Sequence, residues 1–184
     1  MKKNKIALAG LFLWANDLRK SKPAGITINP KSKVKMFDII NAYLPSVGYS
    51  IHWRDTDFEV VDIKWWYKVL EQPIWTADDI KYVAEVADCE AFSLFFLSIC
   101  ELFLRTNGVF SLSAICKWTE KAGVKSSSHR CNVIVATENG NVGMWLFEPM
   151  YNKITKIEKG QGQIILNNVF GLNQMIYIAN MIVE

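Results

Sequence analysis

The sequence predicts an α+β fold in which a central buried helix packs on an antiparallel β-sheet. Three observations indicate it: helical apolar spacing prevails before residue 108, the run 91–104 is apolar on nearly every side, and the alternation typical of strands prevails from Val109 onward. The chain has 184 residues, 51% of them hydrophobic, and can bury one sizeable core. We expect an N-terminal arm and linker over residues 1–33 and one α+β domain over residues 34–184.

The N-terminal arm begins with three lysines, followed by the apolar run 6–15. This order is typical of a secretory signal, but Leu13 and Ala15 make a poor cleavage site. The run is also too short for a membrane span, which needs about 20 residues. We interpret it as an amphipathic helix that packs on the body or on a partner. If the arm packs on a partner, the candidate interactions are formation of a homo-oligomer and assembly into a virion. A cytoplasmic or virion-associated location is favoured, and secretion through residues 1–15 stays open.

The sequence before residue 108 predicts mainly helices. Residues 20–33 hold two prolines and a glycine among polar residues, which predicts a linker. Apolar spacing and breakers then predict a helix over 34–43, a strand over 49–53, and helices over 65–70 and 76–86. The last of these begins with Thr76 and Asp79 in the arrangement of a capping box.

The second half predicts strands. Alternating apolar residues place them at 110–116, 131–135, 142–147, 154–157, 163–169 and 175–183, and the last segment is open between strand and helix. Asn139-Gly140 is typical of a two-residue hairpin turn. The second and third of these strands are therefore expected to pair side by side.

Charge and cysteine spacing exclude several classes of function. Lys and Arg number 21 against 18 Asp and Glu, an excess too small to indicate a nucleic-acid partner. The four cysteines form no CxxC pair and no zinc-finger spacing, which favours reduced thiols. Cys100, Cys116 and Cys131 lie in apolar segments and are expected to be small buried residues. Cys89 differs because it stands at the start of a helix.

Cys89, His129 and Glu148 follow one another in an order that suits thiol catalysis. A cysteine in the first turn of a helix feels the positive end of the helix dipole, which favours the thiolate. A histidine on a nearby strand can take the thiol proton, and a carboxylate on its second nitrogen fixes the tautomer. Counting back from Asn139 to His129 and forward from Gly140 to Glu148 leaves a mismatch of two residues. A bulge or a longer loop is expected to absorb it.

Three motifs resemble a family. The chain resembles phage and bacterial proteins that are similar to the papain-like C-terminal domain of the Marasmius oreades agglutinin. The family pattern is Asp-Cys-acid-acid-Phe-Ala, His-Ala-x-Asn-Val and Trp-x-x-Glu-Pro-Gln. The matching segments here are Asp88-Cys89-Glu90-Ala91-Phe92, His129-Arg130-Cys131-Asn132-Val133 and Trp145-Leu146-Phe147-Glu148-Pro149. The resemblance covers roughly residues 36–158. It implies a papain-like fold with Cys89 as nucleophile, His129 as general base and Glu148 as orienting carboxylate.

The resemblance also implies a cofactor. The family member with a lectin domain is a calcium-dependent cysteine protease, so Asp88 and Glu90 are candidate calcium ligands. These acids would oppose thiolate formation by like-charge repulsion, and a bound cation would reverse that effect. Helix N-terminal acids stabilised by the dipole are the alternative interpretation. Ala91, Arg130 and Met150 depart from the family pattern, and the loss of two oxygen-bearing side chains, an acid at Ala91 and a glutamine at Met150, weakens the metal inference most.

Two functions remain open from the sequence. The first is a papain-like thiol hydrolase that cleaves a peptide or amide bond in a peptide or protein substrate; an amine acceptor in place of water is not distinguished. The second is a non-catalytic phage virion or accessory protein, a binding or structural module that retains the fold. Tryptophans 65, 66 and 75 would line its recognition surface, unless they pack in the core.

Overall fold

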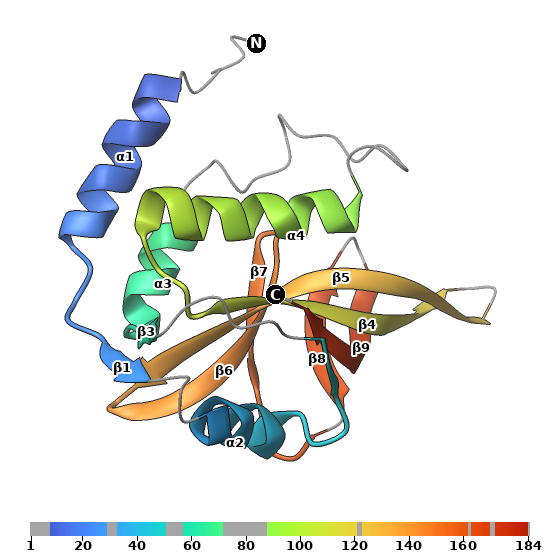
Figure 1. Ribbon diagram of the computed structural model, residues 1–184. Helices are drawn as coiled ribbons and strands as arrows, with labels where there is room; N and C mark the ends of the chain where they lie inside the picture. The colour runs from blue at the N-terminus through green and yellow to red at the C-terminus, as the bar shows by residue number, and fades with distance from the viewer. Residues whose placement is uncertain are drawn as a thin grey trace, which may run out of the picture.

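Helices lie on both faces of a mostly antiparallel sheet in the computed structural model, which describes residues 8–28, 33–50, 57–71, 88–120, 123–161, 163–169 and 172–183 (Figure 1). The α+β prediction is confirmed. The helix expected over 76–86 lies outside the described residues. The described helices are α1 (Leu8–Lys20), α2 (Lys33–Tyr43), α3 (Ile63–Leu70) and α4 (Cys89–Ser98), which continues as the π-helical segment η2 (Ile99–Leu104).

The strands form a large sheet and a small one. The described strands are β1 (Ile26–Ile28), β2 (Gly48–Ser50), β3 (Phe58–Val60), β4 (Val109–Glu120), β5 (Gly123–Glu138), β6 (Asn141–Glu148), β7 (Lys153–Ile157), β8 (Gln163–Val169) and β9 (Leu172–Val183). The large sheet has the order β2-β9-β4-β5-β6-β7, and β8 also pairs with β9. Its pairs are antiparallel except β2 with β9. Strands β4, β5 and β6 form the part that carries the candidate site.

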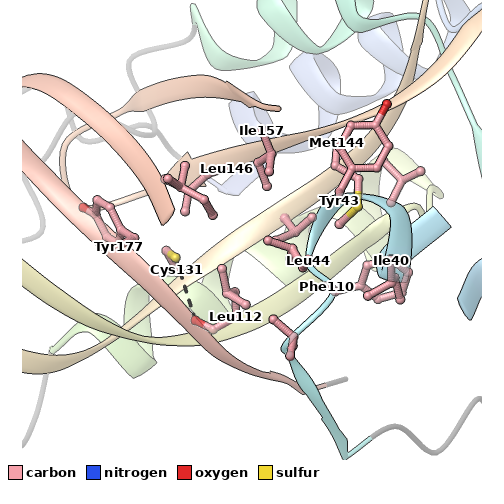
Figure 2. Packing of buried hydrophobic residues seen from close by; sticks show 14 of the residues in the cluster. Ile40, Tyr43, Leu44, Phe110, Leu112, Cys131, Met144, Leu146, Ile157 and Tyr177 are labelled. Atoms are coloured by element: carbon pink, nitrogen blue, oxygen red, sulfur yellow. Dashed lines mark hydrogen bonds between the residues drawn. The ribbon is translucent and has the colours of Figure 1, made fainter. Parts of the chain in front are cut away.

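The central part of the large sheet is buried on both faces. Along β5, Val133 and Val135 face the apolar cluster that contains α2, whereas Ile134 faces the cluster that contains α3 and α4. Figure 2 shows the first cluster, from Ile40 of α2 to Tyr177 of β9. Successive residues of a strand point to opposite faces, so the apolar run in β5 fits a strand covered on both sides.

The N-terminal helix packs on the body, as predicted. Ala15 of α1 is buried in the cluster of α3 and α4, and the rings of Phe12 and Phe103 lie 5.0 Å apart. Among the described residues, no helix is long and apolar enough to cross a membrane.

The linker prediction for residues 20–33 was wrong in part. Lys20 still belongs to α1, and Ile26–Ile28 forms β1, which pairs with β3. Ile28 is buried in the core as a result. The prolines and the glycine in this segment indicated a loop, whereas three of its residues form a strand. So short a strand is stabilised by pairing with β3 rather than by its own sequence pattern.

The prediction that the helix following Cys89 is buried on nearly every side was also wrong. Phe92 and Phe96 are buried against the sheet, but Leu94 is 52% exposed and Leu102 is 72% exposed. The helix forms an outer layer on one face of the sheet (Figure 1), so only its inner side is enclosed. An apolar composition does not distinguish a central helix from such a covering helix.

The strand predictions from residue 109 onward were correct. Of the strand expected over 49–53, residues 49 and 50 belong to β2, and residues 51–53 lie outside the described residues. The segment 175–183, which the sequence left open, belongs to β9. The hairpin between β5 and β6 turns at Asn139 and Gly140, with positive φ angles of 52° and 79°. Both residues tolerate this left-handed backbone, as such a turn requires.

The buried thiols and tryptophans belong to the core. Cys100, Cys116 and Cys131 are buried and free, as predicted. Trp65 and Trp66 are also buried, which confirms the alternative that they pack in the core and excludes a recognition surface built on this pair. Trp75 lies outside the described residues.

Candidate active site

Cys89 is the first residue of α4. Asp88 precedes it in extended conformation, and its Oδ1 accepts hydrogen bonds from the backbone N–H groups of Glu90 (3.1 Å) and Ala91 (3.2 Å). This capping fixes the helix start at Cys89 because it satisfies amides that have no partner inside the helix. The thiol therefore lies at the positive end of α4, as the sequence predicts.

His129 and Glu148 come from neighbouring strands. The last pair between β5 and β6 joins Asn132 to Phe147, and no register shift interrupts the ladder. Continuing this register places Cys131 opposite Glu148, and His129 two residues further along the same face. Diagonal neighbours of this kind lie within reach of long side chains, and His129 Nε2 lies 2.5 Å from Glu148 Oε2. The expected bulge is absent from this ladder; the diagonal offset accounts for the mismatch of two residues.

The Glu148 carboxylate is fully buried and held at both oxygens. Its exposed fraction is 0%. Tyr177 OH donates to Oε2 over 3.2 Å, and the Met150 N–H donates to Oε1 over 3.2 Å. Burial, followed by the negative charge of Glu148, raises the pKa of Tyr177, so its hydroxyl stays a donor. The carboxylate therefore has one orientation in which it can accept from the imidazole.

The Cys89 thiol lies beside His129, in the part of β5 that β6 does not pair with. The Cys89 thiol is hydrogen-bonded to the His129 side chain and to the backbone N–H of Arg130. Since Nε2 of His129 is taken by Glu148, Nδ1 is the nitrogen left for the sulfur. Helix α4 covers one face of the sheet, whereas Glu148 belongs to the other face with Tyr177. Sulfur and imidazole can meet because β6 stops pairing with β5 at Asn132.

The electrostatics of the pair favour a thiolate and an imidazolium. The hydrogen bond from His129 lowers the pKa of Cys89 below its usual value of 9.0, and it outweighs burial, which raises it. Burial alone would lower the pKa of His129, but the hydrogen bonds with Cys89 and Glu148 raise it to about 10. Asp88 raises the pKa of Cys89, as the sequence predicts, but its contribution is the smallest of the five causes.

These shifts predict selective alkylation at Cys89. At pH 7.5, iodoacetamide is expected to modify Cys89 at least about tenfold faster than any other thiol, because only the thiolate reacts and burial raises the pKa of Cys116 to about 12. The rate at Cys89 should fall as the pH is lowered through its reduced pKa. Peptide mapping by mass spectrometry across pH 5–9 checks this. Reaction at Cys89 that begins only near pH 9 would contradict it.

A polar cluster ties α4 to the sheet beside the site. Ser93 Oγ lies 3.0 Å from Ser111 Oγ and donates to the Cys131 carbonyl over 3.3 Å. Asn132 Nδ2 in turn donates to the Ser93 carbonyl over 3.3 Å. Because Ser93 is one helical turn from Cys89, these contacts hold the thiol at a fixed distance from β5. Buried polar groups fix position more strictly than apolar contacts do, since losing a partner is costly.

The acids beside Cys89 have partners within the protein. Asp88 caps α4, and Glu90 Oε1 lies 3.4 Å from Nη2 of Arg130. Among the described residues, no group of three or more His, Cys, Asp or Glu side chains could hold a metal ion. Calcium takes six to eight oxygen ligands, so these two carboxylates do not by themselves fit it. Calcium at Asp88 and Glu90 stays a prediction from the resemblance.

The structure adds three residues to the site. Tyr177, Ser93 and Asn132 hold the site together, and sequence reasoning did not identify them. For Tyr177 the sequence held one signal: Met175 and Tyr177 alternate with their neighbours, and in a strand both side chains would point to the buried face. Ser93 is one of three polar residues in the run 91–104, with Ser98 and Glu101, and a polar residue within such an apolar run indicates a partner if it is buried.

The site thus combines an α+β fold, a histidine–carboxylate pair on two antiparallel strands and a cysteine at the start of a helix. No family model, no curated protein and no solved structure matches this chain.

Proposed function

We propose that this protein is a papain-like thiol hydrolase that cleaves peptide or amide bonds. The observation that carries the proposal is the hydrogen-bonded series of Cys89 at the start of α4, His129 within β5 and Glu148 at the end of β6. The resemblance of the three motifs assigns the same residues to the same roles. A binding module has no need for a buried carboxylate that orients a histidine toward a thiol.

The first half of the reaction uses the ion pair. The Cys89 thiolate attacks the carbonyl carbon of the substrate, a C–S bond forms, and the π electrons move to the oxygen. When the tetrahedral intermediate collapses, the C–N bond breaks and the His129 imidazolium gives its proton to the leaving nitrogen. The products of this step are a free amine and a thioester on Cys89.

The second half restores the enzyme. Neutral His129 takes a proton from water, whose oxygen attacks the thioester carbon; the C–S bond then breaks and the electrons return to sulfur. Glu148 keeps the same imidazole orientation throughout and stabilises the imidazolium in both halves. Amide and water are thereby converted to acid and amine.

The start of α4 offers one donor for the oxyanion. Asp88 takes up the N–H groups of Glu90 and Ala91, and the Phe92 N–H bonds to the Asp88 carbonyl. Among the described residues of this turn, the Cys89 N–H is the amide left over. It points from the positive helix end, where negative charge on the substrate oxygen is stabilised.

Cleavage of an unfolded protein tests the proposal. Wild-type protein incubated with reduced, carboxymethylated lysozyme is expected to yield new amino termini, detected by mass spectrometry. Iodoacetamide pretreatment should abolish cleavage with the same time course as modification of Cys89. Cleavage that persists after Cys89 is fully alkylated, or no cleavage by protein whose Cys89 reacts as a thiolate, would contradict the proposal.

A further inference from the structure

Among the described residues, no strand pairs with the outer edge of β5 beside the candidate site, and we call this part of β5 the open edge. Strand β6 pairs with β5 only from Asn132 to Glu138, whereas β4 pairs with β5 along its length as far as Gly123. No described strand pairs with the outer edge of β5 between residues 123 and 131. Residues 123–128 are exposed, and Figure 1 shows β4 and β5 extending together beyond α4.

The ladder determines which backbone groups point outward along this edge. The N–H groups of Val135 and Thr137 bond to Gly108 and Val61, on the side of β5 that faces β4. Since successive residues of a strand alternate, even-numbered residues of β5 direct N–H and C=O toward the opposite edge. Val124, Ser126 and Ser128 therefore present their backbone groups outward.

The Cys89 thiol lies beside the next position of this row. A hydrogen bond from the backbone N–H of Arg130, the next even-numbered residue after Ser128, lowers the pKa of Cys89. A chain paired with Ser126 and Ser128 would continue directly to the thiol. A strand paired with the open edge would therefore run toward the proposed nucleophile.

The edge has few of the features that protect exposed strands from pairing. The β4–β5 register runs without a shift from Val109↔Ile134 to Glu120↔Gly123, and this part of β5 contains no proline. Natural edge strands are usually blocked by bulges, prolines or charges. Lys125 is the one charged residue in 123–128.

We propose that the open edge of β5, residues 124–128, binds the substrate as an added β-strand and delivers its scissile bond to Cys89. This inference rests on the proposed hydrolase function and names the substrate class: an unfolded peptide segment of at least about four residues in extended conformation. Main-chain hydrogen bonds supply the affinity in this mode of recognition. Small amides and folded segments are not expected to pair with the edge in this way.

Proline at position 126 tests the edge. Ser126→Pro removes an outward N–H and places a ring on the edge, a position where strands tolerate proline. Ser126→Ala keeps the N–H and is the matched control. On carboxymethylated lysozyme, kcat/KM of Ser126→Pro is expected to be at least about tenfold below that of Ser126→Ala, as the loss of about one hydrogen bond implies. On acetyl-amino-acid p-nitroanilides the two should agree within about twofold, and iodoacetamide should modify Cys89 equally fast in both.

A binding measurement separates the edge from catalysis. Hydrogen exchange of the Cys89→Ala protein with overlapping twelve-residue lysozyme peptides is expected to slow at least about threefold in the segment 123–130. No slowing, or equal cleavage of the unfolded protein by the proline and alanine variants, overturns the edge inference alone. Absence of hydrolysis by wild type overturns the proposed function, whereas slowed exchange would still support the edge. A wild-type dimer that Ser126→Pro dissociates would assign the edge to a second copy of the chain and overturn the inference.

Discussion

Cys89→Ala is expected to lower kcat for cleavage of carboxymethylated lysozyme on the order of 10⁶-fold, which is the size of effect seen when a nucleophile is removed from a catalytic triad. Alanine keeps the helix start, since Asp88 caps α4 through the amides of Glu90 and Ala91 and not through the Cys89 side chain. Folding should therefore be preserved while the thiolate is lost. Cleavage is followed by new amino termini, and folding by the thermal midpoint.

Cys100→Ala is the matched control for the loss of a thiol. Cys100 is fully buried in the cluster of α3 and α4 and is not hydrogen-bonded to His129. Its replacement costs about 1 kcal/mol of stability for the small cavity, and kcat should stay within about twofold of wild type. Equal activity of Cys89→Ala and Cys100→Ala would remove Cys89 from the reaction.

Glu148→Gln is expected to lower kcat/KM by about 10³- to 10⁴-fold, because the neutral amide favours the wrong imidazole tautomer and no longer stabilises the imidazolium. The pKa of His129 should fall, since the hydrogen bond and the charge of Glu148 are two of the causes that raise it. Without the imidazolium, the Cys89 pKa should rise and alkylation at pH 7 should slow. Activity and iodoacetamide rates measured on the same preparation check this.

The same variant has a pH-dependent effect on stability. A histidine whose pKa is raised by folding stabilises the protein fully below its unfolded value of 6.5, and this contribution disappears as the pH rises through the folded value near 10. The loss of unfolding free energy in Glu148→Gln should therefore be larger at pH 6 than at pH 9. Glu138→Gln, which removes a partly exposed carboxylate from its pair with Lys156, is the matched control and should change stability by less than about 1 kcal/mol. Equal effects of the two substitutions would contradict the assigned role of Glu148.

The site residues could be found in the sequence because each has a local signal. The capping aspartate marks the start of α4 at Cys89, and Asn139-Gly140 fixes the hairpin that sets the register of β5 and β6. A hairpin of known register determines which residues become diagonal neighbours, so His129 and Glu148 follow from counting. Only the assumption of a bulge was unnecessary.

The rest of the site depends on contacts between distant segments. Tyr177 reaches Glu148 from β9, and no periodicity in either segment identifies the other. Asn132 and Ser93 meet only because α4 lies across β5. The exposed side of α4, with Leu94 and Leu102, was missed for the same reason: which side of an apolar helix is covered depends on its neighbours.

Trapping the acyl-enzyme tests the thiol mechanism most directly. Wild-type protein is mixed with overlapping lysozyme peptides, quenched in acid within seconds, and digested for mass spectrometry. A thioester between a peptide carbonyl and the sulfur of Cys89 is expected, enriched over every other cysteine. An acyl group on a different residue, or cleaved peptide without any adduct at Cys89, would contradict nucleophilic catalysis by this thiol.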